Sequence, residues 1–172
     1  RIAFVGITTP ETFTKSTPAY FMNKAQTKYI YDILGGEDGQ KLYSAVQKAV
    51  DKAKCLADVV IGLGHLGVDP SSSPWTSEEV IAHTTGFDAF IDGHSHTVMT
   101  ASKDNSMVQS TGTGLAYVGA IVIDNATKSI ESNGLIDLSA YTKEDATVKA
   151  AADKIISDIN AEYGKVFART DV

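Results

Sequence analysis

Three of the four histidines in this chain follow short apolar segments. His65 lies in the sequence GLGHLG, and His94 and His96 lie in DGHSHT. Imidazole is a common ligand of zinc, manganese and iron. His94 and His96 alternate by two, so in an extended loop both rings could face one metal ion or two adjacent ions. The residues themselves leave two interpretations open, a metal site or histidines that serve turns and the surface.

The segments in front of these histidines are typical of buried strands. Continuous apolar runs, bounded by turn residues, predict strands at Asp58–Gly64 and Asp88–Gly93, and a similar run predicts a strand at Ile2–Thr8. In layered α/β folds, ligands bind beyond the carboxyl ends of such strands. If the two histidine-bearing strands are neighbours, His65 and His94 meet at that edge of the sheet.

Two helices are predicted between the strands. Apolar residues recur at helical spacing from Leu42 to Leu56. Thr76, with Glu79 three residues on, predicts a capped second helix that ends near Gly86. The fourth histidine, His83, falls inside that helix and is interpreted as a surface or packing residue. Because helices alternate with continuous apolar strands, we expect an α/β fold.

The remaining segments frame this α/β pattern. Residues 11–39 are expected to be irregular, with at most a short helix or hairpin. Short strands are predicted in 106–110, 116–124 and 128–139, with Asp124–Lys128 as a hairpin loop. The last helix is predicted to begin at Thr142, to end at Gly164 and to bury one face. The residues expected on that face are Val148, Ala151, Ala152, Ile155, Ile156 and Ile159.

Composition excludes some classes of partner. The 172 residues suffice for one domain with a sizeable core. The net charge of −6 argues against binding to a nucleic acid polymer or an anionic membrane surface, since both attract basic proteins. No apolar run approaches the roughly 18 residues of a membrane span. The chain opens inside a predicted strand and ends on an apolar, alternating stretch, so we expect it to be a piece of a longer protein.

The sequences DVVIGLGHLG and FDAFIDGHSHT resemble two signature blocks of the calcineurin-like metallophosphoesterases. The particular residues of both blocks are similar to those of the branch that contains 5′-nucleotidases, UDP-sugar hydrolases and 2′,3′-cyclic-nucleotide phosphodiesterases. VGITTPET and YVGAIVID also resemble segments of that branch. The resemblance implies part of a metallophosphoesterase α/β/β/α sandwich, with mixed sheets and outer helices. Residues 1–163 would form the C-terminal half of the catalytic domain. Residues 164–172 would form a linker and the start of a separate nucleotidase domain.

The same resemblance implies a two-metal site that hydrolyses nucleotide phosphate esters. His65 and His94 would bind one divalent ion, zinc, manganese or similar, and His96 would bind the other. The family's remaining ligands lie in blocks upstream of these motifs and are not found in this chain, so its catalytic residues are not assigned. The missing N-terminal half of the domain is thus an expected partner. The family also implies a periplasmic, cell-surface or secreted protein.

We therefore expect a fragment of a phosphoesterase that is inactive by itself. The alternative is a non-catalytic binding or structural module derived from the same fold.

Overall fold

The computed structural model describes residues 1–100 and 107–164. The chain divides into two compact units, Arg1–Leu138 and Ser139–Val172. Residues 164–172 were expected to form a linker and the start of a further domain, and all of them except Gly164 lie outside the described residues.

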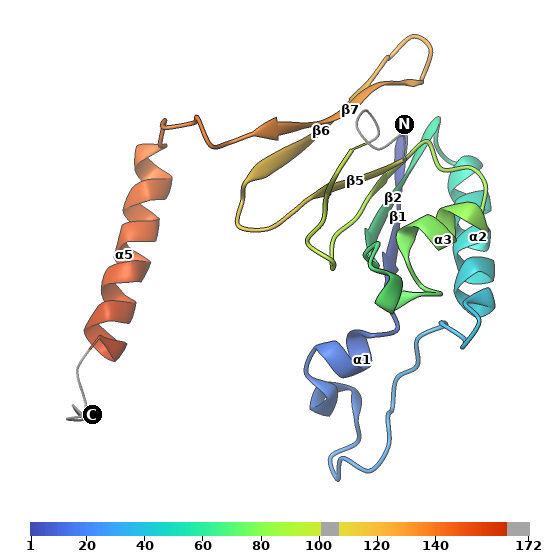
Figure 1. Ribbon diagram of the computed structural model, residues 1–172, viewed down its shortest axis with the longest axis horizontal. Coiled ribbons are helices and arrows are strands. Elements are labelled where there is room, and N and C mark those ends of the chain that lie inside the picture. Colours follow the sequence, from blue (N-terminus) through green and yellow to red (C-terminus); the bar gives the residue numbers. More distant parts are fainter. Residues whose placement is uncertain (101–106, 165–172) are drawn as a thin grey trace. The chain divides into compact units, whose positions relative to one another are not determined.

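In the first unit, strands alternate with helices as far as β3, and four further strands follow (Figure 1). Its strands are β1 (Ile2–Thr8), β2 (Val59–His65), β3 (Ala89–Ile91), β4 (Val98–Met99), β5 (Val108–Thr111), β6 (Tyr117–Ile123) and β7 (Ile130–Asp137). Its helices are α1 (Thr12–Lys15), α2 (Gln40–Lys54) and α3 (Ser77–Ala82), with 3-10 turns η1 (Pro18–Phe21) and η2 (Pro70–Ser72). The predicted strand at 2–8 and the irregular character of 11–39 are confirmed.

Two sheets form the centre of this unit. The larger one has the strand order β1-β2-β3-β5-β4, with β1, β2, β3 and β5 parallel and β4 antiparallel. The second sheet is the antiparallel hairpin β6–β7, whose connecting loop includes the predicted segment 124–128. The order places β2, which ends at His65, beside β3, which precedes His94.

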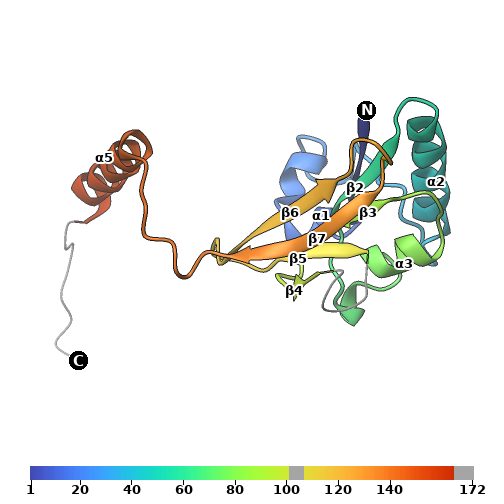
Figure 2. The same cartoon turned by 90° about the horizontal axis from the view of Figure 1, so that it is seen from above.

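The large sheet is covered on both faces (Figure 2). On one face, Val5 and Ile7 of β1 pack into a core with Val46 and Val50 of α2 and Val80 of α3. On the other face, three buried residues of β2 and β3 pack against the hairpin; they are Val59, Ile61 and Ala89. This gives three of the four layers expected. Within the described residues of the first unit, a second outer helical layer is absent.

Helix α3 is shorter than its sequence pattern predicts. Thr76 caps its start as expected, because its hydroxyl accepts a hydrogen bond from the Glu79 amide at 3.3 Å. The helix ends at Ala82 rather than near Gly86, and His83 is its C-cap instead of an interior residue. The Thr84 hydroxyl donates to the Val80 carbonyl at 2.6 Å, so a side chain replaces the next backbone bond of the helix.

The second unit contains helix α5 (Ala146–Tyr163). It begins at Ala146 rather than Thr142, because Asp145 is its N-cap and accepts from the amides of Thr147 and Val148. It ends at Gly164 as predicted. The prediction that α5 buries one face is wrong. None of the helix's residues is buried, since the described part of its own unit offers no other element to pack against.

No helix in the described part of the chain has both the length and the apolar character needed to cross a membrane.

Candidate functional site

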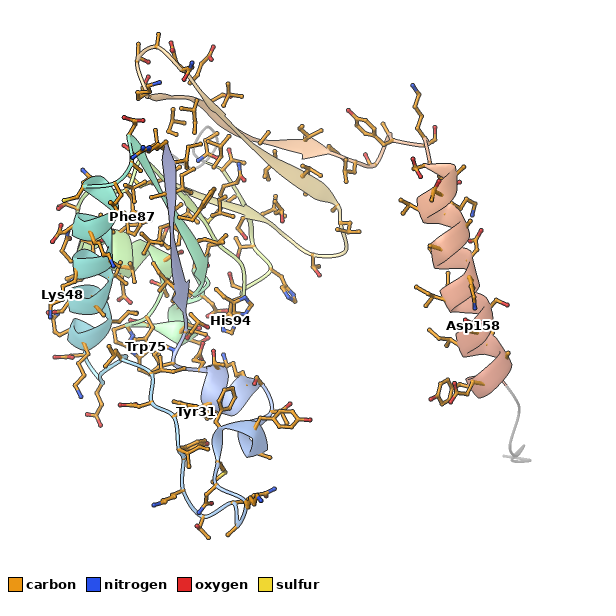
Figure 3. All side chains as sticks on the ribbon, turned by 180° about the vertical axis from the view of Figure 1, so that it is seen from behind. Tyr31, Lys48, Trp75, Phe87, His94 and Asp158 are labelled. Atoms are coloured by element: carbon orange, nitrogen blue, oxygen red, sulfur yellow. The ribbon has the colours of Figure 1, made fainter. Side chains whose placement is uncertain are left out.

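The carboxyl ends of β1, β2 and β3 carry the polar residues of the candidate site. Since these strands are parallel, the loops that follow them lie at the same edge of the sheet. Figure 3 shows His94 at this end of the sheet, where the chain leaves β1 toward α1. The sequence expectation that His65 and His94 share one edge is thus met by the strand order.

His65 and His94 face each other directly. Nε2 of His65 lies 3.2 Å from Nδ1 of His94, and the ring centroids are 4.9 Å apart. His65 is the last residue of β2, and His94 follows β3 by three residues. One nitrogen from each ring therefore points to a common place between them.

The backbone at His94 is strained. The amide of Ser95 donates to the Gly93 carbonyl at 3.1 Å, and His94 between them has a φ of 76°. A three-residue turn with positive φ at its centre is rare. Side chains other than glycine adopt this conformation at an energetic cost, and such residues cluster at functional sites. The strain favours a functional role for this turn.

His96 does not lie in the extended loop that its spacing suggested. Its φ is 54°, so the backbone is left-handed at both histidines of the motif, and its side chain is exposed. Within the described part of the chain, His96 makes no hydrogen bond to His65 or His94. Among residues 1–100 and 107–164, no group of three or more His, Cys, Asp or Glu side chains is arranged to hold a metal ion.

Two side chains of the β3 loop hold the β2 loop in place. Oδ1 of Asp92 accepts from the Leu66 amide at 2.9 Å, and Oγ of Ser95 accepts from the Val68 amide at 3.2 Å. The loops approach closely at Gly67, where φ is 76° and a Cβ atom would lie 3.2 Å from His94 Cδ2. These contacts fix the backbones on either side of the histidine pair.

A carboxylate that the sequence reasoning missed lies against His94. Oε2 of Glu11, from the loop after β1, is 2.9 Å from Nε2 of His94. The same oxygen accepts from the Ser72 hydroxyl at 2.8 Å, and Oε1 pairs with Lys15 Nζ at 2.7 Å. Burial by itself raises the pKa of Glu11, but the hydrogen bonds from Lys15, Ser72 and His94 together lower the pKa below its ordinary range. Glu11 is therefore held as a carboxylate.

Asp69, Asp88 and Asp92 each accept a hydrogen bond from a backbone amide, as turn and strand-end residues do. Asp92 accepts from the Leu66 amide, as described above. Asp88 accepts from the Val60 amide at 2.7 Å, and Asp69 accepts from the Ser71 amide at 2.8 Å. Hydrogen bonds to Ser71 are the largest contribution to the lowered pKa of Asp69. The second oxygen of Asp92 is buried and has no hydrogen-bond partner in the described structure.

His83 is a packing residue. Its ring stacks on Tyr43 with centroids 4.3 Å apart and an interplanar angle of 6°, and its Nδ1 lies 2.8 Å from the Glu79 carbonyl. It is not part of the histidine pair.

A small polar cavity opens beside the histidine pair, with a volume of about 230 Å³. It is lined by Thr8, Thr9, Thr12, Lys15, Ser16, His65 and His94. Four of these residues carry a hydroxyl group and Lys15 carries an ammonium group. Such groups donate hydrogen bonds to anionic oxygen atoms.

Comparison with solved structures supports the architecture. The calcineurin-like phosphoesterase YfkN from Bacillus subtilis superposes with a TM-score of 0.66 at 19% identity, over 95% of this chain and 53% of that one. A candidate 5′-nucleotidase from Staphylococcus aureus superposes with a TM-score of 0.56 at 17% identity, over 91% of this chain and 31% of that one. No family model and no curated protein matches the sequence.

This chain therefore spans about half or less of the length of the structures that it resembles. At such identities the likeness concerns the fold. It confirms the architecture that the resemblance of the two histidine motifs implied: the chain has the fold of part of a calcineurin-like phosphoesterase.

Proposed function

We propose that this chain is part of a two-metal phosphoester hydrolase that acts on nucleotides. The observation that carries the proposal is the 3.2 Å separation between His65 Nε2 and His94 Nδ1 at the ends of neighbouring strands. Zinc binds histidine nitrogen at about 2.0–2.1 Å with tetrahedral geometry, which places two ligating nitrogens about 3.3 Å apart. The pair thus has the spacing of two ligands of one ion.

His65 and His94 would hold one ion, and His96 would contribute to a second, as the resemblance to the family implies. A divalent ion supplies a Lewis acid for the phosphoryl oxygens and lowers the pKa of a bound water. The chain's own residues have simpler tasks. Asp92 and Ser95 fix the backbones that carry the rings, and the polar cavity is suited to binding the oxygens of a phosphate group.

Three further expectations belong to this proposal: the substrate, the longer parent protein and its location. The similarity to a candidate 5′-nucleotidase supports a nucleotide as substrate. The chain spans 53% of the phosphoesterase YfkN, which supports an origin in a longer protein whose other segments complete the catalytic domain. Residues 1–163 would be the C-terminal half of that domain, with 164–172 leading into the next one. A periplasmic, cell-surface or secreted location is proposed on the family resemblance, and cell fractionation of the full-length protein would test it.

The second candidate function is a binding or structural module without catalysis. The observation that favours it is that, in the part of the chain the structure describes, no third ligand joins His65 and His94. The sequence upstream of Arg1 discriminates between the two functions. The family's Asp-x-His and Asn-His-Glu blocks there would support the hydrolase, and their absence would support the module.

Calorimetric titration with zinc tests the proposed metal site. We expect at most one weakly bound ion, because a catalytic zinc usually has three protein ligands and this pair supplies two. His65→Ala and His94→Ala should each abolish the binding. His83→Ala is the matched control and should bind as the parent chain does, since His83 stacks on Tyr43 instead. Binding that survives both site substitutions would refute the assignment of this pair.

Hydrolysis of a nucleoside monophosphate with added manganese or zinc tests the expected inactivity of the isolated chain. No turnover is expected, because the family's upstream ligands, including the carboxylate that bridges the two ions, are not found in this sequence. Turnover that disappears in His94→Ala would show instead that the chain carries a complete site.

A further inference from the structure

We propose that Glu11 is a positioning residue that fixes the tautomer and orientation of His94. By accepting a hydrogen bond at Nε2 of His94, the carboxylate leaves the lone pair of Nδ1 directed at His65. The inference rests on the proposed function, since it assigns Glu11 as the outer support of a ligand in that metal site.

The contacts of Glu11 use both of its oxygens. Oε2 is 2.9 Å from His94 Nε2 and 2.8 Å from the Ser72 hydroxyl, and Oε1 is 2.7 Å from Lys15 Nζ. The side chains of Glu11 and His94 are only 12% and 15% exposed, and Ser72 is 1% exposed. Water therefore competes little for these hydrogen bonds.

A carboxylate can only accept hydrogen bonds, and this sets the protonation of the neutral ring. Nε2 of His94 must carry the proton that Glu11 accepts, so Nδ1 is left without one. Nδ1 is the atom 3.2 Å from His65. Metal-bound histidines almost always donate their other N–H to a carboxylate, carbonyl or water, which fixes the tautomer and raises the basicity of the ligand. His94 already has such a partner on the side away from His65.

Glu11 is itself anchored to the histidine that His94 faces. The Thr9 amide donates to the His65 carbonyl at 3.0 Å, and the Glu11 amide donates to the Thr9 hydroxyl at 3.2 Å. Ser72, whose hydroxyl donates to Glu11, belongs to the 3-10 turn η2 in the segment after β2. One carboxylate thus joins the loops after three parallel strands, and we expect it to hold His94 in its strained turn.

Nitrogen NMR of the histidine rings, in the metal-free 172-residue chain, tests the role of Glu11. The measurement is made at about pH 8, above the ordinary titration range of histidine, and distinguishes protonated from unprotonated ring nitrogens. The parent chain should show His94 with the proton on Nε2. Glu11→Ala should give a mixture of tautomers, and Glu11→Gln, which keeps a weaker acceptor, should lie between the two. Glu37→Gln is the control, because Glu37 is exposed and makes no hydrogen bond in the described structure.

Zinc titration of the same proteins gives a second readout. Loss of an outer-shell partner typically lowers metal affinity by about 10- to 100-fold. We expect a loss of that size in Glu11→Ala, a smaller loss in Glu11→Gln and none in Glu37→Gln.

The same His94 tautomer in the parent chain, Glu11→Ala and Glu11→Gln would overturn the proposal. If Glu11→Ala does not fold, the near-isosteric Glu11→Gln decides alone: a His94 tautomer ratio unchanged from the parent overturns the proposal, and a shift toward protonated Nδ1 supports it. If the parent chain binds no zinc, the metal site of the proposed function fails, and the tautomer measurement still decides the role of Glu11.

Discussion

Glu11 connects the chemistry of the candidate site to the stability of the fold. Its carboxylate contacts Lys15, Ser72 and His94, which lie in the segments that follow β1, β2 and β3. Burial opposes its ionisation, and the three hydrogen bonds outweigh burial, so its pKa is lowered in the folded chain. A group of this kind stabilises the native state only while it is ionised.

We therefore predict that Glu11→Gln destabilises the metal-free chain in a pH-dependent way. The stabilisation from a lowered pKa is present above the unfolded-state value, and it is lost as the pH falls through the lowered folded-state value. Near neutral pH the variant should be less stable by about 1.5–3 kcal/mol, the contribution of hydrogen bonds to a charged group. Urea denaturation of both proteins from pH 7 down to about pH 3 measures the difference.

The difference in free energy of unfolding between the parent chain and Glu11→Gln should become smaller toward pH 3. Glu37→Gln, an exposed substitution of the same type, should follow the parent chain throughout. A gap for Glu11→Gln that stays constant from pH 7 to pH 3 would show that the charge of Glu11 does not stabilise the fold.

At the scale of elements, the site depends on how closely β2 and β3 pack. A Cβ atom on Gly62 of β2 would lie 2.3 Å from Cδ2 of Phe90, the fully buried ring of β3. Gly6 of β1 is a strand glycine in the same sheet, but a Cβ atom there would meet nothing within 4 Å. The two glycines therefore form a matched pair for testing close packing.

Gly62→Ala should destabilise the chain by about 1–3 kcal/mol, the usual cost of forcing extra volume into a packed core. Gly6→Ala should change the free energy of unfolding little, because its methyl group enters open space. Denaturant unfolding of the two variants beside the parent chain makes the comparison. Equal losses of stability in both would mean that the contact with Phe90 does not limit this position.

At the scale of the whole molecule, β1 is one of the two edge strands of the large sheet. It is the first strand in the sheet order, and among the described strands only β2 pairs with it. Ile2 and Phe4 of this strand are 50% and 59% exposed, and Leu63 of β2 is 48% exposed. An exposed apolar edge is a template for pairing with another chain.

We predict that the isolated chain associates with itself as its concentration rises and that Phe4→Lys reduces this association. A lysine on an edge strand opposes edge-to-edge pairing, and the fold should tolerate the change because Phe4 is largely exposed. Sedimentation velocity over a range of concentrations measures the effect. Leu115→Lys, which alters an exposed leucine in the loop before β6, is the control and should associate as the parent does. A parent chain that stays monomeric throughout would contradict the prediction.

The sequence by itself determined the parts of this protein that depend on local pattern. The strand at Ile2–Thr8 and the end of the last helix at Gly164 were predictable because apolar runs and a terminal glycine act over a few residues. The meeting of His65 and His94 was also predictable, because each follows a buried strand and parallel neighbouring strands end at one edge. The likeness in fold to a phosphoesterase was expected from the resemblance of the same two motifs to that family.

Only the tertiary structure decided what depends on contacts between distant segments. Glu11 lies 83 residues from His94 in sequence, and no local signal marks it as that ring's partner. The backbone is left-handed at His94 and His96 in place of the extended loop that their spacing suggested, and Asp92 and Ser95 on either side of His94 bind the neighbouring loop. Helix α3 ends earlier than its apolar pattern predicts. The Thr84 hydroxyl donates to the Val80 carbonyl in place of the next backbone amide of the helix. The periodicity of a sequence indicates which face of a helix or strand is apolar. Which of the compatible conformations the chain adopts depends on contacts with distant residues, which form only in the folded protein.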